Sequence, residues 1–434
     1  MLLSLRRKID HKIRARRWVF YLFLGLLIMC FGFAFFCLAV LMLAPATVET
    51  LRSFHPMALA FTAFTAFLIS SFWLNKGLTI AFELLDTRDA DLSSRLKEFV
   101  FHRSHNNEGL QSLVALGGGT GLSSLLKGLK EIDVRLTAVV TVTDDGGSSG
   151  RLRKDLQILP PGDIRNCIVA LSRSESLLSR LFQYRFSEGG DIEGHSFGNL
   201  FIAAMTGIIG DFSSAVREVS SILAIKGHVV PVTNDNVQLK AEFVDGTEMV
   251  GETAICEVKK PIAKMMIVPE ATPNQEALSA IDDANMIVLG PGSLYTSVIP
   301  NLLVSGVVEH INNSQATVVY ICNVMTQPGE TDSFSAIDHV KTILDTTGLK
   351  KLDIVVVNSR RAAKQLMEKY EAKNQYWVPP TVKKIEDLGI RVVAADLLSE
   401  SDMLRHDPNT LAAIIANLLE ENKKDLDAIS MTEE

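Results

Sequence analysis

The sequence predicts an α/β protein with a mainly parallel sheet, preceded by two transmembrane helices. Short apolar runs rich in β-branched residues recur along the chain, and helical patterns follow most of them. Continuous apolar strands of this kind are typical of a parallel sheet with helices on both faces. A long run without charged residues near the N-terminus indicates the membrane anchor. With 434 residues, of which 47% are hydrophobic, the chain can bury a core of substantial size.

Residues 1–76 are predicted to form the membrane anchor. Residues 18–43 carry no charged side chain, and they exceed the roughly 20 residues that a helix needs to cross a bilayer. Residues 57–74 are shorter and less apolar, so they form either a second span or an interfacial helix. Seven Lys and Arg residues precede the first run, which places the N-terminus, and after two spans the main domain, in the cytoplasm. A cleaved signal peptide is disfavoured because its apolar stretch would be shorter.

The main domain is predicted to span residues 111–420. A connecting helix or tether, residues 77–110, precedes it, and a polar tail, residues 421–434, follows it. Alternating positions about an Asp-Gly turn within residues 230–269 predict an inserted antiparallel hairpin. The predicted strands of the parallel sheet are residues 113–116, 137–142, 286–289, 317–321 and 354–357.

Small and polar residues gather directly after the predicted strands. Because ligands bind outside the carboxyl ends of the strands in open α/β sheets, these turns should line one pocket. The first turn, "LGGGTGL", can bring backbone N–H groups and a helix N-terminus to a phosphate. It matches neither the GxGxxG nor the Walker spacing, so a tight strand-to-helix turn is the alternative. Its candidate ligand-binding residues are Gly117, Gly118, Gly119, Thr120 and Gly121.

The second turn, "TDDGGSSGR", places two carboxylates after a strand. Asp144 and Asp145 stand where an acid commonly binds a ribose hydroxyl, and such a pair can instead help to hold Mg²⁺. A solvated Asx turn is the alternative, because glycine and serine follow at once. The density of glycines and donors favours a functional turn. Its further candidate residues are Gly146, Gly147, Ser148 and Arg151.

Two predicted helix starts carry further candidates. In "LPPGDIRNCIVAL", Asp163 is well placed as an N-cap, and Arg165 and Asn166 can bind a phosphate from the first turn. In "GHSFGNL", His195 and Asn199 are four residues apart, and they share a face if the helix has already begun at His195. No second histidine stands at metal-ligand spacing, so a zinc centre is not predicted.

The turn "LGPGSLYTS" follows a later strand. Gly290, Gly292 and Ser293 supply a second turn that can cradle an anion. Tyr295 either stacks on a base or sugar or packs in the core, and the segment itself does not favour one of the two.

Taken in order, these motifs resemble the YvcK family of gluconeogenesis factors. The resemblance rests on "ALGGGTGLSSLLKGLK", "TVTDDGGSSGRLR", "LPPGDIRNCIVAL", "LFQYRF", "GHSFGNL", "LGPGSLYTSVIPNLLV" and "CNVMTQPGETD", and it covers residues 111 to about 420. The family is related to the CofD transferases, which make a phospholactyl precursor of a coenzyme. The resemblance implies their three-layer Rossmann-like fold and binding of a uridine diphosphate sugar, notably UDP-N-acetylglucosamine. It implies no particular reaction.

The resemblance also implies roles for the candidate residues. Gly118, Gly119 and Thr120 would meet the diphosphate, and the aspartate pair would lie at the ribose or metal position. Gly292, Ser293 and Tyr295 would face the nucleotide sugar, and His195 and Asn199 would line the pocket. Familiar members of the family are soluble and begin near the glycine turn, so the predicted membrane anchor is a departure.

Three function classes follow, in decreasing order of preference. The first is a non-catalytic regulator at the cytoplasmic face of the bacterial inner membrane, which binds a UDP-sugar and links carbon metabolism to cell shape through an envelope-synthesis partner protein. The second is a CofD-type, Mg²⁺-dependent transferase acting on a nucleotide-activated substrate. The third is an NAD-dependent oxidoreductase, which rests on the fold alone and is disfavoured because the GxGxxG spacing is not matched. A homo-oligomer is possible for each.

Composition excludes other classes. The formal net charge of −7 gives no broad basic surface, so nucleic acid is not a predicted partner. The five cysteines include no CxxC pair, which argues against a disulfide framework and a zinc cage.

Overall fold

The computed structural model describes residues 110–172, 177–399 and 404–430. The two predicted transmembrane helices, residues 18–43 and 57–74, lie outside these residues, as does nearly all of the predicted tether. Within the described residues, no helix combines the length and apolar character that a bilayer span requires.

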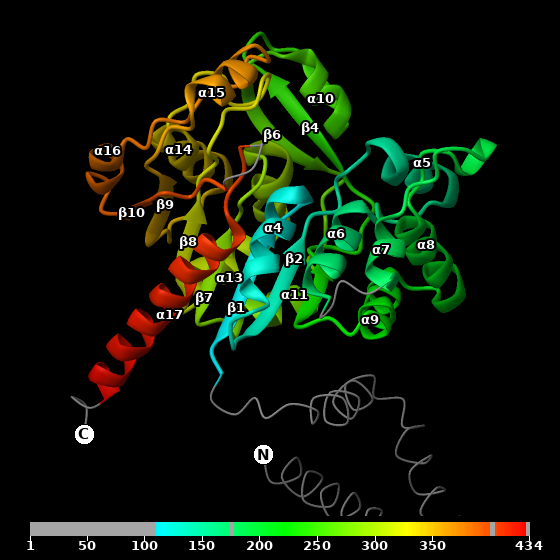
Figure 1. The fold of residues 1–434 in the computed structure, drawn as a ribbon, viewed down its shortest axis with the longest axis horizontal. Helices are drawn as coiled ribbons and strands as arrows, with labels where there is room; N and C mark the ends of the chain where they lie inside the picture. Colours follow the sequence, from blue (N-terminus) through cyan, green and yellow to red (C-terminus); the bar gives the residue numbers. More distant parts are fainter. Residues whose placement is uncertain (1–109, 173–176, 400–403, 431–434) are drawn as a thin grey trace, which may run out of the picture. The chain divides into compact units, whose positions relative to one another are not determined.

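A seven-stranded parallel sheet forms the centre of the described region (Figure 1). Its strand order is β10-β9-β8-β7-β1-β2-β3, and every neighbouring pair is parallel. The predicted α/β fold with a mainly parallel sheet is therefore confirmed. The strands are β1 (Ser112–Gly117), β2 (Arg135–Val140), β3 (His228–Pro231), β7 (Met286–Leu289), β8 (Thr317–Ile321), β9 (Ile354–Asn358) and β10 (Arg391–Ala395).

The strand order reverses beside β1. From β1 the chain builds outward through β2 and β3, and it then returns to the other edge of β1 with β7. From β7 it continues in the opposite direction through β8, β9 and β10. The carboxyl ends of β1 and β7 therefore flank the topological switch point, which is where ligands bind in sheets of this kind.

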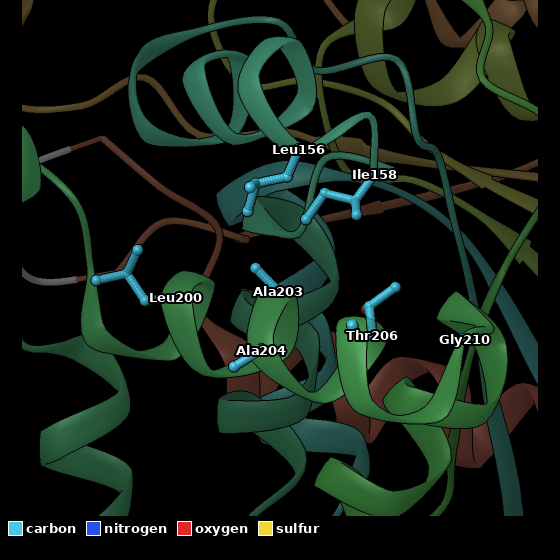
Figure 2. A pocket seen from close by; sticks show the side chains of 8 residues that line it. Leu156, Ile158, Leu200, Ala203, Ala204, Thr206 and Gly210 are labelled. Atoms are coloured by element: carbon cyan, nitrogen blue, oxygen red, sulfur yellow. The ribbon is translucent and has the colours of Figure 1, made fainter.

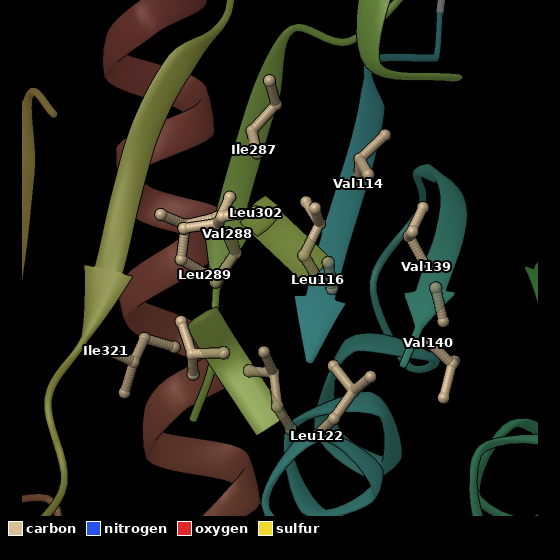
Figure 3. Packing of buried hydrophobic residues seen from close by; sticks show 14 of the residues in the cluster. Val114, Leu116, Leu122, Val139, Val140, Ile287, Val288, Leu289, Leu302 and Ile321 are labelled. Atoms are coloured by element: carbon tan, nitrogen blue, oxygen red, sulfur yellow. The ribbon is translucent and has the colours of Figure 1, made fainter. Parts of the chain in front are cut away.

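The core lies on both faces of the central strands. All six residues of β1 and all four of β7 are buried, so helices must cover both faces of the sheet. Figure 3 shows Val114, Leu116, Val139 and Leu289 among the buried side chains of the central strands, with Leu122 of the first helix after β1 near the end of that strand. Burying each such side chain contributes about 1.5–3 kcal/mol relative to leaving it exposed.

The helices form two packed groups. On one side α17, α4 and α6 contact one another in sequence, and α11, α13, α12, α14 and α16 form a second chain of contacts. The helices are α4 (Gly119–Leu129), α5 (Gly147–Leu156), α6 (Gly162–Leu171), α7 (Leu177–Gln183), α8 (Phe197–Ile209), α9 (Phe212–Ile222), α10 (Glu252–Val258), α11 (Gln275–Asp282), α12 (Ile299–Leu303), α13 (Val307–Asn313), α14 (Ala336–Thr347), α15 (Lys364–Glu371), α16 (Val382–Glu386) and α17 (Pro408–Ser430), with a 3₁₀ turn η2 (Gly190–Ile192) and a π-helical turn η3 (Leu294–Val298). The first ten residues of the predicted polar tail belong to α17.

The predicted inserted hairpin is part of a three-stranded antiparallel sheet. Its order is β5-β4-β6, with β4 (Gln238–Phe243), β5 (Glu248–Val250) and β6 (Ile262–Val268). Along β4 the residues Leu239, Ala241 and Phe243 are buried and alternate with polar residues, as a one-sided strand requires. The predicted Asp-Gly turn joins β4 to β5, and α10 lies between β5 and β6. This insertion places α10 near the carboxyl ends of the parallel strands, as its contacts show below.

Candidate functional site

The two predicted glycine turns touch each other at the switch point. α4 begins at Gly119, directly after β1, and the turn after β7 runs from Gly290 to Ser293. A Cβ atom on Gly121 would fall well inside contact distance of the Pro291 carbonyl oxygen. Only glycine at this position lets the two turns approach so closely. Their contact brings the amino end of α4 and the "GPGS" segment to one place, as the strand ends predict.

The start of α4 is open to a ligand. Gly118 is the N-cap residue and provides no side-chain hydrogen bond, while Gly119 has a φ of +60° and Thr120 is exposed. The first N–H groups of a helix lack partners inside the helix, and its dipole makes this end positive. One of these groups, the Gly119 N–H, donates to the carboxylate of Asp163.

The prediction that Asp163 caps its own helix is wrong. Pro161 is the N-cap residue of α6, and no side chain caps this helix end. The Asp163 carboxylate instead reaches across to the first glycine turn, where a Cβ atom on Gly118 would lie 2.7 Å from Asp163 Oδ2. Because Gly118 has no side chain, the carboxylate can approach the backbone of the turn.

Asp163 belongs to a group of carboxylates, the acidic half of the site, formed by Asp144, Asp163, Glu252 and Glu330. Burial and repulsion from Asp144 raise the pKa of Asp163 to about 7. Burial and repulsion from Asp144 and Asp163 raise the pKa of Glu252 to about 9. Burial also raises the pKa of Glu330, against hydrogen bonds from Ser293 and Cys256 that lower it. Carboxylates that repel one another in this way favour binding a proton or a cation.

The second turn shows how the predicted aspartate pair is held. Asp144 Oδ1 accepts the Gly146 N–H at 2.9 Å. This hydrogen bond forms the Asx turn that the sequence offered as the alternative to a ligand-binding turn. Asp145 Oδ1 accepts both the N–H and the hydroxyl of Thr253, at 2.9 and 2.7 Å. Asp145 therefore ties the start of α10, and with it Glu252, to the end of β2. Gly147 is exposed with a φ of +45° and begins α5.

Glu330 ties a third segment to the same place. Its Oε2 accepts the Ser293 hydroxyl, and its Oε1 accepts the Cys256 thiol of α10 at 3.4 Å. The Tyr295 backbone N–H also donates to this carboxylate. Glu330 is 8% exposed, so it is held between the turn after β7 and the inserted sheet.

Tyr295 packs in the core. Its side chain is 5% exposed, it belongs to the main hydrophobic cluster, and it is hydrogen-bonded to the side chain of Thr342 of α14. Burial raises the pKa of this phenol. This placement favours core packing over stacking on a base, the two alternatives that the sequence left open.

His195 and Asn199 meet at Ser148. His195 Nδ1 lies 2.9 Å from Ser148 Oγ, and Asn199 Nδ2 donates to the same oxygen at 3.0 Å. All three side chains are at most 5% exposed. Burial and the charges of Arg151 and Arg185 lower the pKa of His195, so the neutral imidazole is favoured. α8 begins at Phe197, so His195 precedes the helix and the prediction of a shared helix face is wrong; the two side chains converge on the start of α5 through Ser148 instead.

The arginines lie beside this buried network. Arg165 Nη2 donates to Asn166 Oδ1 at 2.7 Å and its Nη1 donates to Ser196 Oγ, whereas Arg151 is exposed and donates to the Glu193 carbonyl at 2.6 Å. Sequence reasoning missed Arg153, which is 8% exposed. The charges of Asp145 and Asp144 raise the pKa of this guanidinium. Burial, the larger effect, lowers its pKa.

Two acidic residues were also missed. Glu330 lies in "CNVMTQPGETD", a polar segment after a predicted strand, so its position was a usable signal. Glu252 lies in the inserted segment and carries no local signal, because only the tertiary fold brings α10 to the strand ends. Within the described residues, no three His, Cys, Asp or Glu side chains are gathered closely enough to hold a metal ion by themselves.

A separate pocket of about 520 Å³ lies between the end of α5 and α8 (Figure 2). Its lining is largely apolar and contains none of the predicted site residues. The lining residues are Leu156, Ile158, Leu200, Ala203, Ala204, Thr206, Gly207 and Gly210. Such a lining suits apolar contacts and offers a phosphate no charged donor.

Comparison with known proteins establishes the family. The chain matches the family described as 2-phospho-L-lactate transferase CofD over residues 113–398. The chain belongs to the CofD family. This CofD-family chain is 46% identical over 311 residues to the gluconeogenesis factor of Bacillus subtilis, covering 71% of this chain and 98% of that protein. It is 47% identical over 307 residues to the gluconeogenesis factor of Halalkalibacterium halodurans, covering 70% and 95% of the two chains.

A solved structure agrees with this CofD-family fold. A crystal structure of a Bacillus halodurans protein superposes with a TM-score of 0.70 at 46% identity, covering 71% of this chain and 99% of that one. The predicted kinship with the gluconeogenesis factors and with CofD is therefore confirmed.

Proposed function

We propose that this chain binds a uridine diphosphate sugar, such as UDP-N-acetylglucosamine, outside the carboxyl ends of β1 and β7. The contact between the two glycine turns at the switch point carries the proposal. The uncapped start of α4 offers N–H groups and a positive helix end to the diphosphate. The exposed Thr120 stands beside these groups, and Gly292 lies against Gly121 at the same helix start.

We further propose that the bound state is a regulatory signal. Relatives that cover most of this chain are named gluconeogenesis factors, which supports a role in carbon metabolism. On this proposal the apolar runs 18–43 and 57–74 anchor the domain at the cytoplasmic face of the bacterial inner membrane. There it would report the supply of nucleotide sugar to an envelope-synthesis protein and so affect cell shape.

Calorimetric titration of the full chain in detergent with UDP-N-acetylglucosamine tests the binding. We expect saturable binding that is lost in Thr120→Phe, because the ring would fill the space in front of the α4 N-terminus. Lys127→Phe is the matched control, since it places the same ring on an exposed position at the other end of α4. Absence of binding to the wild-type chain, or equal loss in the control, would refute the proposal.

A CofD-type transferase activity is the second candidate. The acidic half of the site favours it, because a transferase needs to neutralise the phosphate charge that develops during the reaction. Mg²⁺ in proteins is commonly held by one or two carboxylates together with phosphates and water, and Asp144 and Asp163 are placed for this. When bound, the ion would act as a Lewis acid on a phosphate oxygen. Asp163 also fixes the first turn through the Gly119 N–H.

Turnover of nucleotide-activated substrates by the full chain, with and without Mg²⁺, tests the second candidate. Activity should fall at least 100-fold in Asp163→Asn. It should persist in Asp133→Asn, which alters an exposed aspartate. If Asp163→Asn turns over substrate as fast as the wild-type chain, the acidic half takes no part in the reaction.

A further inference from the structure

Three arginines converge on one short segment, residues 193–196. Arg151 of α5 donates to the Glu193 carbonyl at 2.6 Å, and Arg185, which follows α7, donates to the Gly194 carbonyl. Arg165 of α6 donates to Ser196 Oγ. His195, within this segment, bonds the start of α5 through Ser148. These four side chains, here called the basic half of the site, come from four separate parts of the chain.

The basic half lacks neutralising partners. In the part of the chain that the structure describes, none of its three arginines forms an ion pair with a carboxylate. Burial, and then repulsion from Arg185, lowers the pKa of Arg165, while the smaller effects of the Asp163 and Asp144 charges raise it. The charge of Asp155 likewise raises the pKa of His195, against the lowering by burial and by the two exposed arginines. Like charges held together without a counter-ion are unfavourable, so the arrangement favours a bound anion.

Unused hydrogen-bond donors lie within the cluster. Arg165 is 9% exposed, and its buried Nε has no partner among the described residues. The ten-residue helices α5 and α6 both begin here, and neither N-terminus has a side-chain cap. Arg151 and Arg185 are exposed and hold only backbone carbonyls, which an anion can replace. Guanidinium groups of this kind match phosphate oxygens in pairs.

We propose that the basic half binds the phosphate group of a second ligand, a phosphorylated small molecule distinct from the nucleotide sugar. This deepens the proposed function, on which it rests, because Asp163 and Arg165 occupy the same turn of α6. The acidic and basic halves therefore adjoin each other, since the charges of Asp163 and Arg165 interact. A nucleotide sugar would bind at the start of α4, and the phosphate ester would bind beside the arginines.

Titration of the full chain with methyl phosphate, at constant ionic strength in chloride buffer and followed by ³¹P NMR, tests the inference. We expect saturable binding that weakens at least tenfold in the Arg151→Gln, Arg185→Gln double variant. Both side chains are exposed, so the variant should fold, and its melting curve verifies this. Arg180→Gln, which removes an exposed arginine of α7, should bind as the wild type does. No saturable binding, or equal weakening in Arg180→Gln, would overturn the inference.

Two further arms separate this inference from the proposed function. Inorganic phosphate that binds while methyl phosphate does not would overturn the assignment to a phosphate ester. Thr120→Phe should lose UDP-N-acetylglucosamine binding and keep methyl phosphate binding, whereas the double arginine variant should show the reverse. If the double variant loses both ligands, the arginines belong to the nucleotide-sugar site and no second ligand site exists.

Discussion

The two halves of the site are built from opposite charges in different ways. In the acidic half, carboxylates come from four segments, and burial with repulsion between them raises the pKa of Asp163 and of Glu252. In the basic half, the guanidinium groups donate hydrogen bonds to two backbone carbonyls and one hydroxyl, which use only part of their donors. The comparison teaches that the acidic half favours a bound proton or cation, whereas the basic half favours a bound anion.

The largest expected effect is on the residue that links the halves. Arg165→Met removes the donor to Ser196 and Asn166 and the positive charge that acts on Asp163. We expect the free energy of unfolding, measured by urea denaturation, to fall by about 3 kcal/mol. Arg180→Met, on the exposed face of α7, should change it by less than about 0.5 kcal/mol. A more stable Arg165→Met variant would mean that repulsion from Arg185 outweighs these contacts.

The second effect separates the halves by pH. Glu252 has a raised pKa of about 9 in the folded protein and an ordinary value of 4.5, so between these values the folded state holds a proton that the unfolded state lacks. Stability must therefore fall as the pH rises through this window. Glu252→Gln should make that slope shallower, because only the contribution of Asp163 remains, and should be more stable than the wild type by about 2 kcal/mol at about pH 6.

Urea denaturation across this pH range measures the effect. The two proteins should be equally stable at its acidic end, where Glu252 is protonated in both states. Glu257→Gln alters an exposed glutamate of the same helix and should keep the wild-type slope. An unchanged slope in Glu252→Gln would show that Glu252 does not share in the repulsion.

The third effect concerns the basic half. Ser148→Ala leaves His195 Nδ1 and Asn199 Nδ2 without their shared partner. Unmade hydrogen bonds of buried groups are destabilising, so we expect a loss of about 1.5 kcal/mol in chemical denaturation. Ser221→Ala, at an exposed position of α9, is the control. Equal stability of the two variants would indicate that water reaches the network.

The smallest effect sharpens the role of α10. Thr253→Val removes the hydroxyl that donates to Asp145 and keeps the backbone bond, so about 1 kcal/mol should be lost locally. Hydrogen exchange should become faster in α10 and remain unchanged in α4. Unaltered exchange in α10 would mean that Glu330 and the inserted sheet hold this helix without Asp145.

The central strands could be predicted from the sequence because they are buried on both faces. β7 and β8 have the predicted bounds, β1 is one residue longer at each end, and β9 is one residue longer at its C-terminal end. β3 and β10, the two edge strands of the sheet, were missed, and each begins with an exposed residue. β6 was missed because it pairs with the far side of β4, which no local pattern reveals.

The candidate site was predictable where it follows from strand ends, and not where it depends on side-chain direction. The glycine turns meet as the parallel topology requires. Asp163 faces another turn rather than its own helix end, and Tyr295 faces the core. Glu252 and Arg185 reach the site from segments whose position only tertiary packing fixes.

The pairing of β1 with β7 also has a consequence for biosynthesis. The Ser112 N–H donates to Asn285 Oδ1, which lies 173 residues further along the chain. At about 5–20 residues per second, a ribosome takes roughly 10–35 s to make this stretch. During that time one edge of an apolar strand stays bare and can pair with other nascent chains. Timely completion of the domain therefore depends on protecting β1 until β7 has emerged.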